Sequence, residues 1–253
     1  MNFLYALVRQ PSPKMAEGLL THLDQSDLKP DLALEQWYAY CNILRDYTEV
    51  IEVEPTPECP DSIFVEDTVF VYDNLAVRTR LHESRRGEQA SVISALAERG
   101  LEIVDLPEGA KLEGGDVLKF DGHVWVGLST RTNQAGVDGL AEILETKGVG
   151  VTAAPVRHAL HLKSCLTALP DGAFISHEDY SPPAEFFPGL QYVPEFLGSQ
   201  VVLLGGRSIL MSESAPRTAE LLHGKGFDVI TTPLTEIEKM EGSATCLSVR
   251  VRG

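Results

Sequence analysis

Two residues of this chain could carry out covalent chemistry: a cysteine near the C-terminus and a histidine in the middle. Cys246 follows the Gly/Ser-rich loop "EGSAT", and His161 lies in "RHALHLKS". A cysteine and a histidine with carboxylates nearby can attack an electrophilic carbon, with the thiolate as nucleophile and the histidine as acid and then base. A histidine among apolar residues is more often a core residue, and a terminus is usually weakly constrained. The pair therefore predicts a nucleophilic site only if the last strand fixes Cys246.

Carboxylates surround an apolar segment in "CPDSIFVEDT". Asp61, Glu66 and Asp67 flank Phe64 and Val65, which have the character of core residues. Burying a carboxylate is costly unless a cation or hydrogen-bond donors meet it. The segment therefore predicts a pocket that binds a cation, and a solvated strand end is the alternative that the pattern leaves open.

Further charged residues lie where loops are expected. Glu113 and Asp116 flank the Gly-Gly turn of "LEGGDVL", and Arg131 follows the end of a predicted strand. In "ESRRGE", Arg85 or Arg86 could clamp a carboxylate in a fork geometry, although pairing with a neighbouring glutamate is the commoner outcome. Loops at strand ends often carry function.

Composition narrows the function classes. The 253 residues include 21 Lys and Arg against 37 Asp and Glu, a formal net charge of -16. This balance argues against a nucleic-acid or anionic-membrane partner, because such binding neutralises phosphates with basic residues. A small cationic substrate is compatible with it.

The cysteines and the apolar runs indicate the compartment. The four cysteines show no CxxC spacing, and the N-terminus does not resemble a signal peptide. No apolar run approaches the roughly 20 residues that a membrane span needs. We therefore expect a reduced, cytoplasmic protein with no membrane segment.

A helix followed by an extended run recurs along the chain. The pattern occurs in "EQWYAYCNILRDYTEVIEVEP", "QASVISALAERGLEIVDLP", "LAEILETKGVGVTAAPV" and "RTAELLHGKGFDVITTPL", with a degenerate copy at "PAEFFPGLQYVPEF". Gly100, Gly148 and Gly226 stand where helix C-caps are expected. Five units favour a radial or stacked repeat, but periodicity alone allows an ordinary doubly wound α/β sheet equally well.

Six motifs, in order and spacing, resemble the dimethylargininases, also called dimethylarginine dimethylaminohydrolases. They are "PDSIFVEDT", "ESRRGE", "LEGGDVL", "TRTNQAG", "LHLKS" and "EGSATCLSVR", and the resemblance covers essentially the whole chain. It implies an α/β fold: a five-bladed propeller of ββαβ units with pseudo-fivefold symmetry, the pentein fold, as one catalytic domain over residues 1–253. The implied reaction is hydrolysis of N-methylated arginine to citrulline and a methylamine, with no metal and no organic cofactor. The family also allows a homodimer.

The resemblance assigns the catalytic roles. Cys246 is the expected nucleophile, His161 the proton donor and later the base for water, and Glu113 the carboxylate that orients the histidine. Glu66 and Asp67 are expected to hold the substrate guanidinium. The C-terminal "CLSVRV" would then be the strand that closes the ring and fixes the nucleophile.

The resemblance also assigns the contacts to the amino-acid end of the substrate. Asp61 is expected to bind the α-amino group with help from the backbone carbonyls of Leu19 and Met240, and Arg85 and Arg131 to hold the α-carboxylate. Leu19 rests on the weakest match, because "PSPKMAEGLLTH" fits the family only loosely.

One substrate contact is expected from chemistry alone: Phe64 is the expected wall for the substrate methyl groups.

Two rival functions remain open. An arginine deiminase uses the same residue types, but such chains are usually longer by a helical insertion. A non-catalytic propeller would be expected to lack the cysteine, the histidine or the carboxylates.

Overall fold

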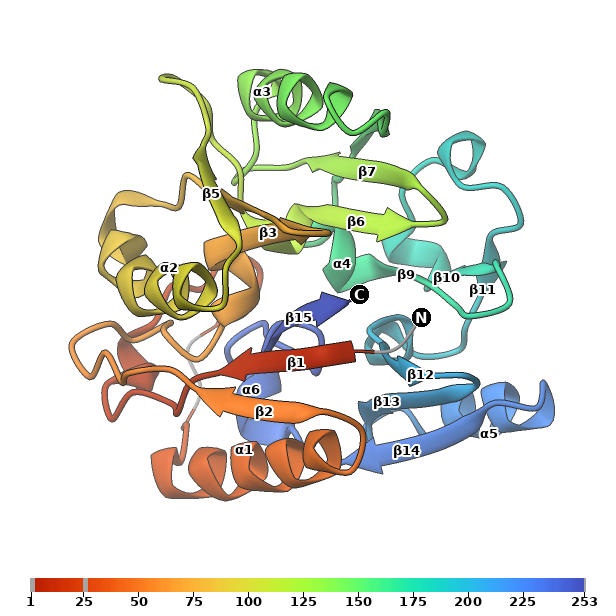
Figure 1. The fold of residues 1–253 in the computed structure, drawn as a ribbon. Coiled ribbons are helices and arrows are strands. Elements are labelled where there is room, and N and C mark those ends of the chain that lie inside the picture. The colour runs from red at the N-terminus through yellow and green to blue at the C-terminus, as the bar shows by residue number, and fades with distance from the viewer. Residues whose placement is uncertain (1–2, 25–26, 253) are drawn as a thin grey trace.

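A computed structural model describes residues 3–24 and 27–252, and within these ranges the strands form five three-stranded sheets (Figure 1). In chain order, the sheets are β15 (Val249–Arg252), β1 (Phe3–Val8) and β2 (Glu49–Glu52); β3 (Val69–Tyr72), β4 (Leu75–Arg78) and β5 (Glu102–Asp105); β6 (Val117–Phe120), β7 (His123–Leu128) and β8 (Gly150–Pro155); β9 (Leu166–Ala168), β10 (Phe174–Ser176) and β11 (Gln191–Tyr192); and β12 (Val202–Gly205), β13 (Ser208–Ser212) and β14 (Asp228–Thr232). The described strands therefore do not form one doubly wound sheet, and the repeat prediction is confirmed at the level of five units.

Each sheet has the same plan: an antiparallel pair, a connection, and a third strand parallel to the second. In four sheets the connection contains a helix: α1 (Pro30–Arg45), α2 (Gln89–Glu98), α3 (Gln134–Glu145) or α5 (Pro216–Gly224). In the β9–β11 sheet it contains only the short 3₁₀ turns Glu178–Tyr180 and Ala184–Phe186. The predicted degenerate unit is thus confirmed, because its prolines are incompatible with a regular helix.

The sequence explains why these helices begin, end and pack as they do. Helix α1 starts with Pro30, whose missing N–H costs nothing at a helix start. It buries residues at helical spacing, among them Trp37 and Tyr40. Three predicted C-cap glycines, Gly100, Gly148 and Gly226, have φ angles of 84°, 69° and 82°, in the left-handed region that favours glycine.

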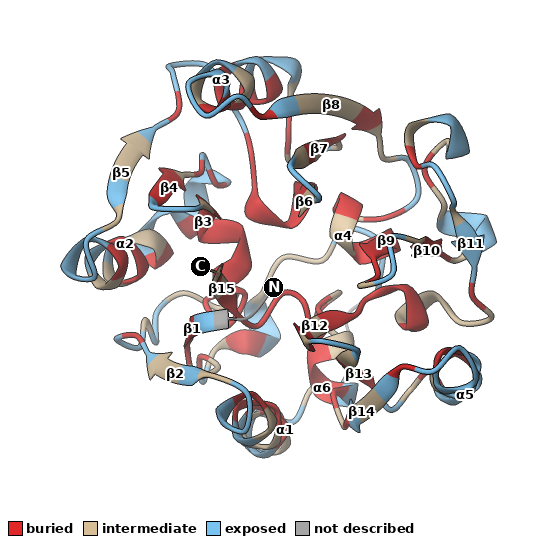
Figure 2. Cartoon of the chain, turned by 45° about the vertical axis from the view of Figure 1, so that its right-hand side comes forward, coloured by how far each residue is buried: buried red, intermediate tan, exposed pale blue. Residues whose placement is uncertain are grey.

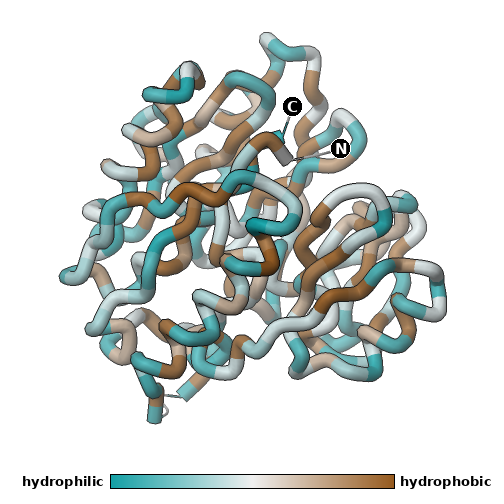
Figure 3. Tube along the Cα trace, turned by 60° about the horizontal axis from the view of Figure 1, so that its bottom comes forward, coloured by the Kyte–Doolittle hydropathy of each residue, from teal (hydrophilic) through white to brown (hydrophobic). Residues whose placement is uncertain are grey.

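The sheets lie around the middle of the molecule, with α1, α2, α3 and α5 on the outside (Figure 2). Hydrophobic stretches run mainly through the interior of the trace, and hydrophilic stretches lie mostly at its periphery (Figure 3). One core cluster packs Trp37 and Tyr40 of α1 against Ile63, Met240 and the expected nucleophile, Cys246. The same packed core that anchors α1 therefore also holds Cys246 in place.

The two ends of the described chain meet in one sheet. Strand β15 pairs antiparallel with β1, with Val249 opposite Leu7 and Val251 opposite Tyr5. Both valines are buried. The expectation that a final strand fixes Cys246 is confirmed, because β15 begins three residues after it.

The remaining short elements surround the site. They are the 3₁₀ turns Met15–Glu17, Val65–Thr68, Glu83–Glu88, Gly114–Asp116 and Phe196–Ser199, and the short helices α4 (Leu162–Cys165) and α6 (Thr235–Glu238). Among the described residues, no helix is long and apolar enough to cross a membrane.

Candidate active site

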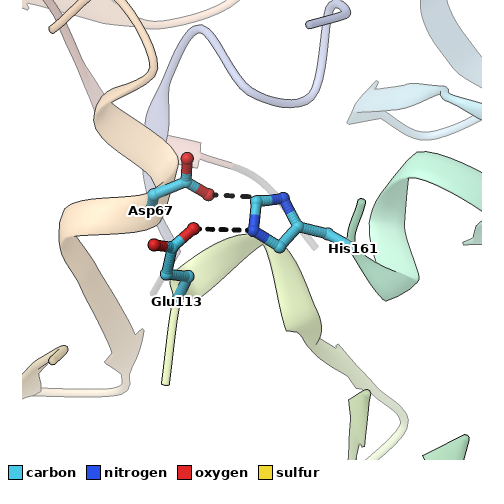
Figure 4. A group of neighbouring side chains, drawn as sticks. All are labelled: Asp67, Glu113 and His161. Carbon is cyan, nitrogen blue, oxygen red and sulfur yellow. Dashed lines mark hydrogen bonds and ion pairs between the residues drawn. The ribbon is translucent and has the colours of Figure 1, made fainter. Parts of the chain in front are cut away.

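His161 lies at the N-terminal end of α4 and contacts two carboxylates from other units (Figure 4). Its Nε2 is 2.8 Å from Oε2 of Glu113, and its Nδ1 is 3.8 Å from Oδ1 of Asp67. All three residues are buried. The imidazole is therefore fixed in orientation by a partner on one ring nitrogen, while the other faces a second negative charge.

The Gly-Gly turn explains how these groups come so close. A Cβ on Gly115 would lie 2.5 Å from Nδ1 of His161 and 2.8 Å from Oδ1 of Asp67. The backbone N–H of Gly115 instead donates to Oδ1 of Asp67 at 3.1 Å. A Cβ on Gly114 would lie 2.0 Å from the backbone oxygen of Glu66. Glycine at both positions is thus required by packing rather than by an unusual φ angle.

The carboxylates set the charge of the imidazole. Burial by itself would lower the pKa of His161, but Asp67 and the hydrogen bond to Glu113 outweigh burial and raise this pKa to about 9. Burial likewise disfavours the charged form of Glu113, yet His161 and the nearby arginines lower its pKa to about 2. At neutral pH the pair is therefore imidazolium and carboxylate, and the histidine carries a proton it can donate.

Asp116 positions this pair, a role that the sequence did not reveal. Its carboxylate is fully buried and accepts hydrogen bonds from the backbone N–H of Leu162 at 2.9 Å, from Ser129 Oγ at 2.6 Å and from Thr132 Oγ1 at 2.7 Å. The first of these bonds fixes the start of α4, and hence His161. The spacing of Asp116 from Glu113 was visible, but its partners lie in segments far along the chain.

Cys246 sits in a tight turn made by the Gly/Ser-rich loop. Its backbone N–H donates to the carbonyl of Ser243 at 3.1 Å, and its side chain is 8% exposed. Burial, together with the negative charges of Glu66 and Asp67, raises the pKa of the thiol to about 11. Cys246 is therefore a neutral thiol at pH 7.

Cys246 and His161 line one cavity of about 20 Å³. Nine of the residues predicted from the sequence line it: Leu19, Asp61, Phe64, Asp67, Arg85, Arg131, His161, Met240 and Cys246. Glu113 adjoins it through His161. Leu160, Glu241 and Gly242 also line the cavity and were not predicted. The volume is too small for an amino acid, so a ligand of that size requires part of the lining to move.

The segment around Leu19 is held over the cavity by two carboxylates. The backbone N–H of Leu19 lies 3.2 Å from each carboxylate oxygen of Asp61. Oε1 of Glu241 accepts hydrogen bonds from three consecutive backbone N–H groups, those of Thr21, His22 and Leu23. Leu20 of the same segment also packs against the core cluster that contains Met240 and Cys246, so opening would break these hydrogen bonds and this contact.

The two arginines predicted to clamp a carboxylate differ in their surroundings. Arg131 is partly buried and makes long contacts, 3.3 Å to Oε1 of Glu113 and 3.4 Å to Oγ1 of Thr21. Arg85 is buried, and its guanidinium contacts Asp67 and Glu88 at 2.8 Å each. Pairing with a neighbouring glutamate, the alternative to a ligand clamp, is therefore observed for Arg85, although the pair is buried rather than on the surface.

Glu66 lies beside Cys246, to whose carbonyl its backbone N–H donates at 3.2 Å, but its side chain does not line the cavity that contains the thiol. Its Oε1 contacts Arg250 and, at 2.8 Å, Lys163. It lines a different cavity, one that also includes Lys119 and Arg252. The side chains of Glu66 and Asp67 thus serve different cavities, because neighbouring residues of a 3₁₀ turn point about 120° apart.

The carboxylates and the histidine are also close enough to hold a metal ion. One donor atom from each of Asp67, Glu113 and His161 lies within 4.8 Å of the others. In this structure both carboxylates contact arginines, Asp67 with Arg85 and Glu113 with Arg131. A metal would have to compete with these cations as well as with the proton on His161.

Comparison with known proteins identifies the family. The family model for eukaryotic N,N dimethylarginine dimethylhydrolase matches residues 21–179. An N(G),N(G)-dimethylarginine dimethylaminohydrolase of Streptomyces coelicolor is 49% identical over 249 residues, covering 98% of this chain and 96% of the relative. The chain belongs to the dimethylarginine dimethylaminohydrolase family.

Solved structures agree with this family and with its fold. A cysteine-to-serine mutant of the dimethylarginine dimethylaminohydrolase family member from Pseudomonas aeruginosa, complexed with citrulline, matches with a TM-score of 0.91 and 27% identity over 99% of this chain and 100% of that one. The N-terminal domain of an arginine dihydrolase from cyanobacteria matches with a TM-score of 0.88 and 22% identity over 99% and 98% of the two chains. The second match shows a shared fold only.

Proposed function

We propose that this protein hydrolyses N-methylated arginine, as asymmetric dimethylarginine or monomethylarginine, to citrulline and a methylamine. The observation that carries the proposal is the site itself. A charged His161–Glu113 pair, 2.8 Å apart, adjoins a cavity that also contains the Cys246 thiol and the carboxylates of Asp61 and Asp67. A cationic, zwitterionic amino acid matches this distribution of charge, and the names of the relatives point to the same substrate class.

The site's electrostatics favour attack only when the substrate is present. The thiol pKa is raised by burial and by carboxylates, so a bound guanidinium lowers that pKa by neutralising them. The thiol then releases its proton to solvent. The thiolate of Cys246 forms a C–S bond to the guanidinium carbon as the π electron pair of the C=N bond moves to nitrogen, giving a tetrahedral adduct. The bond from that carbon to the methylated nitrogen breaks, the electron pair stays on nitrogen, and His161 supplies the proton.

The second half of the reaction reverses the role of the histidine. His161, now neutral, accepts a proton from water, and the water oxygen attacks the carbon still bonded to sulfur. The C–S bond breaks, the carbonyl of citrulline forms, and the proton of the added hydroxyl group passes to the departing thiolate, which restores the Cys246 thiol. Glu113 stabilises the imidazolium in both steps, as the third group expected of a nucleophile and base pair.

The rest of the cavity holds the substrate in the proposed complex. Asp67 binds the guanidinium, Phe64 forms the wall for the methyl groups, and Asp61 binds the α-amino group with Leu19 and Met240 above it. Arg131 is the better placed of the two arginines for the α-carboxylate, because its contacts are long. Arg85 would have to exchange a protein carboxylate for the ligand, and Glu66 contributes charge from the neighbouring cavity.

We also infer that the five sheets close into a single five-bladed α/β propeller with pseudo-fivefold symmetry. The support is the β15–β1 pairing, which puts both ends of the chain in one sheet, and the common ββαβ plan. In such a ring the cavity lies at the centre, where loops from several blades meet.

Arginine hydrolysis is the second candidate. The expectation that chain length excludes it is weakened, because a cyanobacterial arginine dihydrolase domain matches the fold over nearly its full length. Discrimination therefore depends on the methyl groups. A missing methyl is worth about 1–3 kcal/mol in an apolar pocket, so arginine should react at least roughly tenfold less efficiently than methylated arginine.

An assay for the ureido product, which is citrulline from the three arginines and carbamoylputrescine from agmatine, tests the proposal. Asymmetric dimethylarginine, monomethylarginine and arginine are compared by kcat/KM, with agmatine, which lacks the α-carboxylate, as a fourth substrate. We expect both methylated arginines to react well and agmatine poorly. Arginine turnover equal to or faster than that of the methylated substrates would favour the dihydrolase function, and no turnover of any of them would favour a binding module.

A further inference from the structure

A second cavity lies next to the one that contains Cys246. Its volume is about 280 Å³, and Leu160, Glu241 and Gly242 line both cavities as a common wall. The larger cavity is bounded on its other sides by residues remote from the nucleophile, among them Tyr180 and Phe196. The proposed reaction assigns no role to this space.

The walls of the second cavity are apolar and aromatic. The rings of Tyr180 and Phe196 lie with centroids 4.1 Å apart, and Leu23, Ala159 and Leu197 add aliphatic surface. No lysine or arginine is found among the described residues that line it. Aromatic faces attract methylated ammonium ions, because the ring quadrupole is negative over the face.

Three polar residues of this cavity, Gln200, Glu238 and Glu241, offer acceptor oxygens; His22, His158 and Ser164 also line it. Gln200 lines it, is 2% exposed, and its Oε1 has no hydrogen-bond partner among the described residues. Glu241 uses Oε1 to hold loop N–H groups, while its Oε2 has no partner there either. Glu238 contacts only neutral hydroxyls, those of Ser212 and Ser214. An unpaired buried acceptor is costly, so these oxygens favour a ligand that donates hydrogen bonds and carries positive charge.

In the proposed reaction the amine is released before citrulline, so it needs a way out of the first cavity while that cavity is still occupied. In the proposed reaction the amine leaves while the rest of the substrate remains bonded to Cys246 and fills the first cavity. Leaving past Leu19 would require the loop to open with the intermediate exposed. Only the shared wall of Leu160, Glu241 and Gly242 separates the second cavity from the first, so a shift of this wall would let the amine leave, and water enter, without that opening.

We propose that the second cavity is the exit and binding site for the alkylammonium leaving group, an inference that rests on the proposed function. The amine departs neutral after taking one proton from His161, and becomes a cation by taking another from water. Dimethylammonium then presents its methyl groups to Tyr180 and Phe196 and its two N–H donors to Gln200 and Glu241.

Direct binding of dimethylammonium tests this proposal. Saturation-transfer NMR on the methyl signal is measured at constant ionic strength for the wild type, Tyr180→Leu, Gln200→Leu and Tyr192→Leu. Tyr192 is the matched control, since it is exposed on β11 and outside both cavities. We expect saturable binding to the wild type and to Tyr192→Leu, and binding weakened at least threefold, roughly, in Tyr180→Leu.

The binding measurement tests the exit site, and the turnover of methylated arginine tests the proposed function. Absence of saturable binding, or equal binding by wild type and Tyr180→Leu, overturns the exit site even if methylated arginine is hydrolysed. Binding that depends on Tyr180, found in a protein that turns over no methylated arginine, contradicts the proposed function and leaves an alkylammonium site. Tyr180 is partly exposed, so its variant is expected to fold even if the buried Gln200→Leu substitution does not.

Discussion

Cys246 and His161 both respond to the carboxylates around them. The negative charges that keep the imidazole protonated also keep the thiol neutral, and burial adds to the second effect. A substrate that carries positive charge removes the obstacle to the thiolate. The site is thereby matched to guanidinium compounds before any contact to the rest of the substrate is considered.

The first prediction concerns the free thiol. Because its pKa is raised to about 11, alkylation of Cys246 by iodoacetamide should be slow at pH 7 and rise about tenfold for each pH unit up to pH 9. Peptide-resolved mass spectrometry measures the rate, with the buried Cys165 as the internal control. A rate that levels off below pH 8 would contradict the raised pKa.

A second prediction separates the two arginines. Arg131→Ala should raise KM on the order of tenfold and leave the fold intact, because the side chain is partly buried and weakly held. Arg85→Ala should instead lower the free energy of unfolding by about 3–5 kcal/mol, since it leaves Asp67 and Glu88 buried without their cation. Urea denaturation and steady-state kinetics on both variants measure this, and an Arg85 variant as stable as the wild type would be the contrary result.

At the scale of elements, local patterns were readable and cross-unit contacts were not. The helices and following strands of four units, and the three glycine C-caps, follow from periodicity and from conformational preference. The hydrogen bond from Leu162 to Asp116 and the contacts of Glu241 to Thr21 and Leu23 join segments that are distant in the sequence. No local rule brings these together.

The sequence also does not show in which direction two adjacent acidic side chains point. Glu66 and Asp67 read as one acidic cluster, yet the 3₁₀ turn sends one toward Lys163 and Arg250 and the other toward His161. Sequence reasoning identified the residue types of the site because they carry its charge. It could not assign side-chain directions, which depend on turn geometry.

The Gly-Gly turn gives the sharpest prediction at this scale. Gly115→Ala should reduce kcat by on the order of a hundredfold, because the added methyl meets His161 and Asp67 and must displace them. Gly224→Ala, at the end of α5, is the matched control, since nothing lies within 4 Å of its Cβ. Comparable kinetics for the two variants would show that the turn tolerates a side chain.

At the scale of the molecule, the closing strand connects stability to the nucleophile. Val251→Asp should cost more than about 3 kcal/mol of folding free energy by placing a charge in the β15–β1 contact. Leu4→Asp, at a position 59% exposed on β1, is the control and should be nearly neutral. Equal stability of the two variants would mean that the β15–β1 contact contributes little to the stability of the fold.

Assembly is also a property of the whole molecule. The homodimer that the family resemblance allows stays a prediction. Sedimentation velocity across a range of concentrations measures it.

The most direct test of the account is the mass of the protein during turnover. Wild-type protein is mixed with asymmetric dimethylarginine, quenched in acid within the steady state, digested and analysed by mass spectrometry. We predict an adduct of the substrate without its dimethylamine on the peptide that contains Cys246, and none on those with Cys41, Cys59 or Cys165. Citrulline formation with an adduct on another cysteine, or undiminished turnover by Cys246→Ser, would contradict the mechanism.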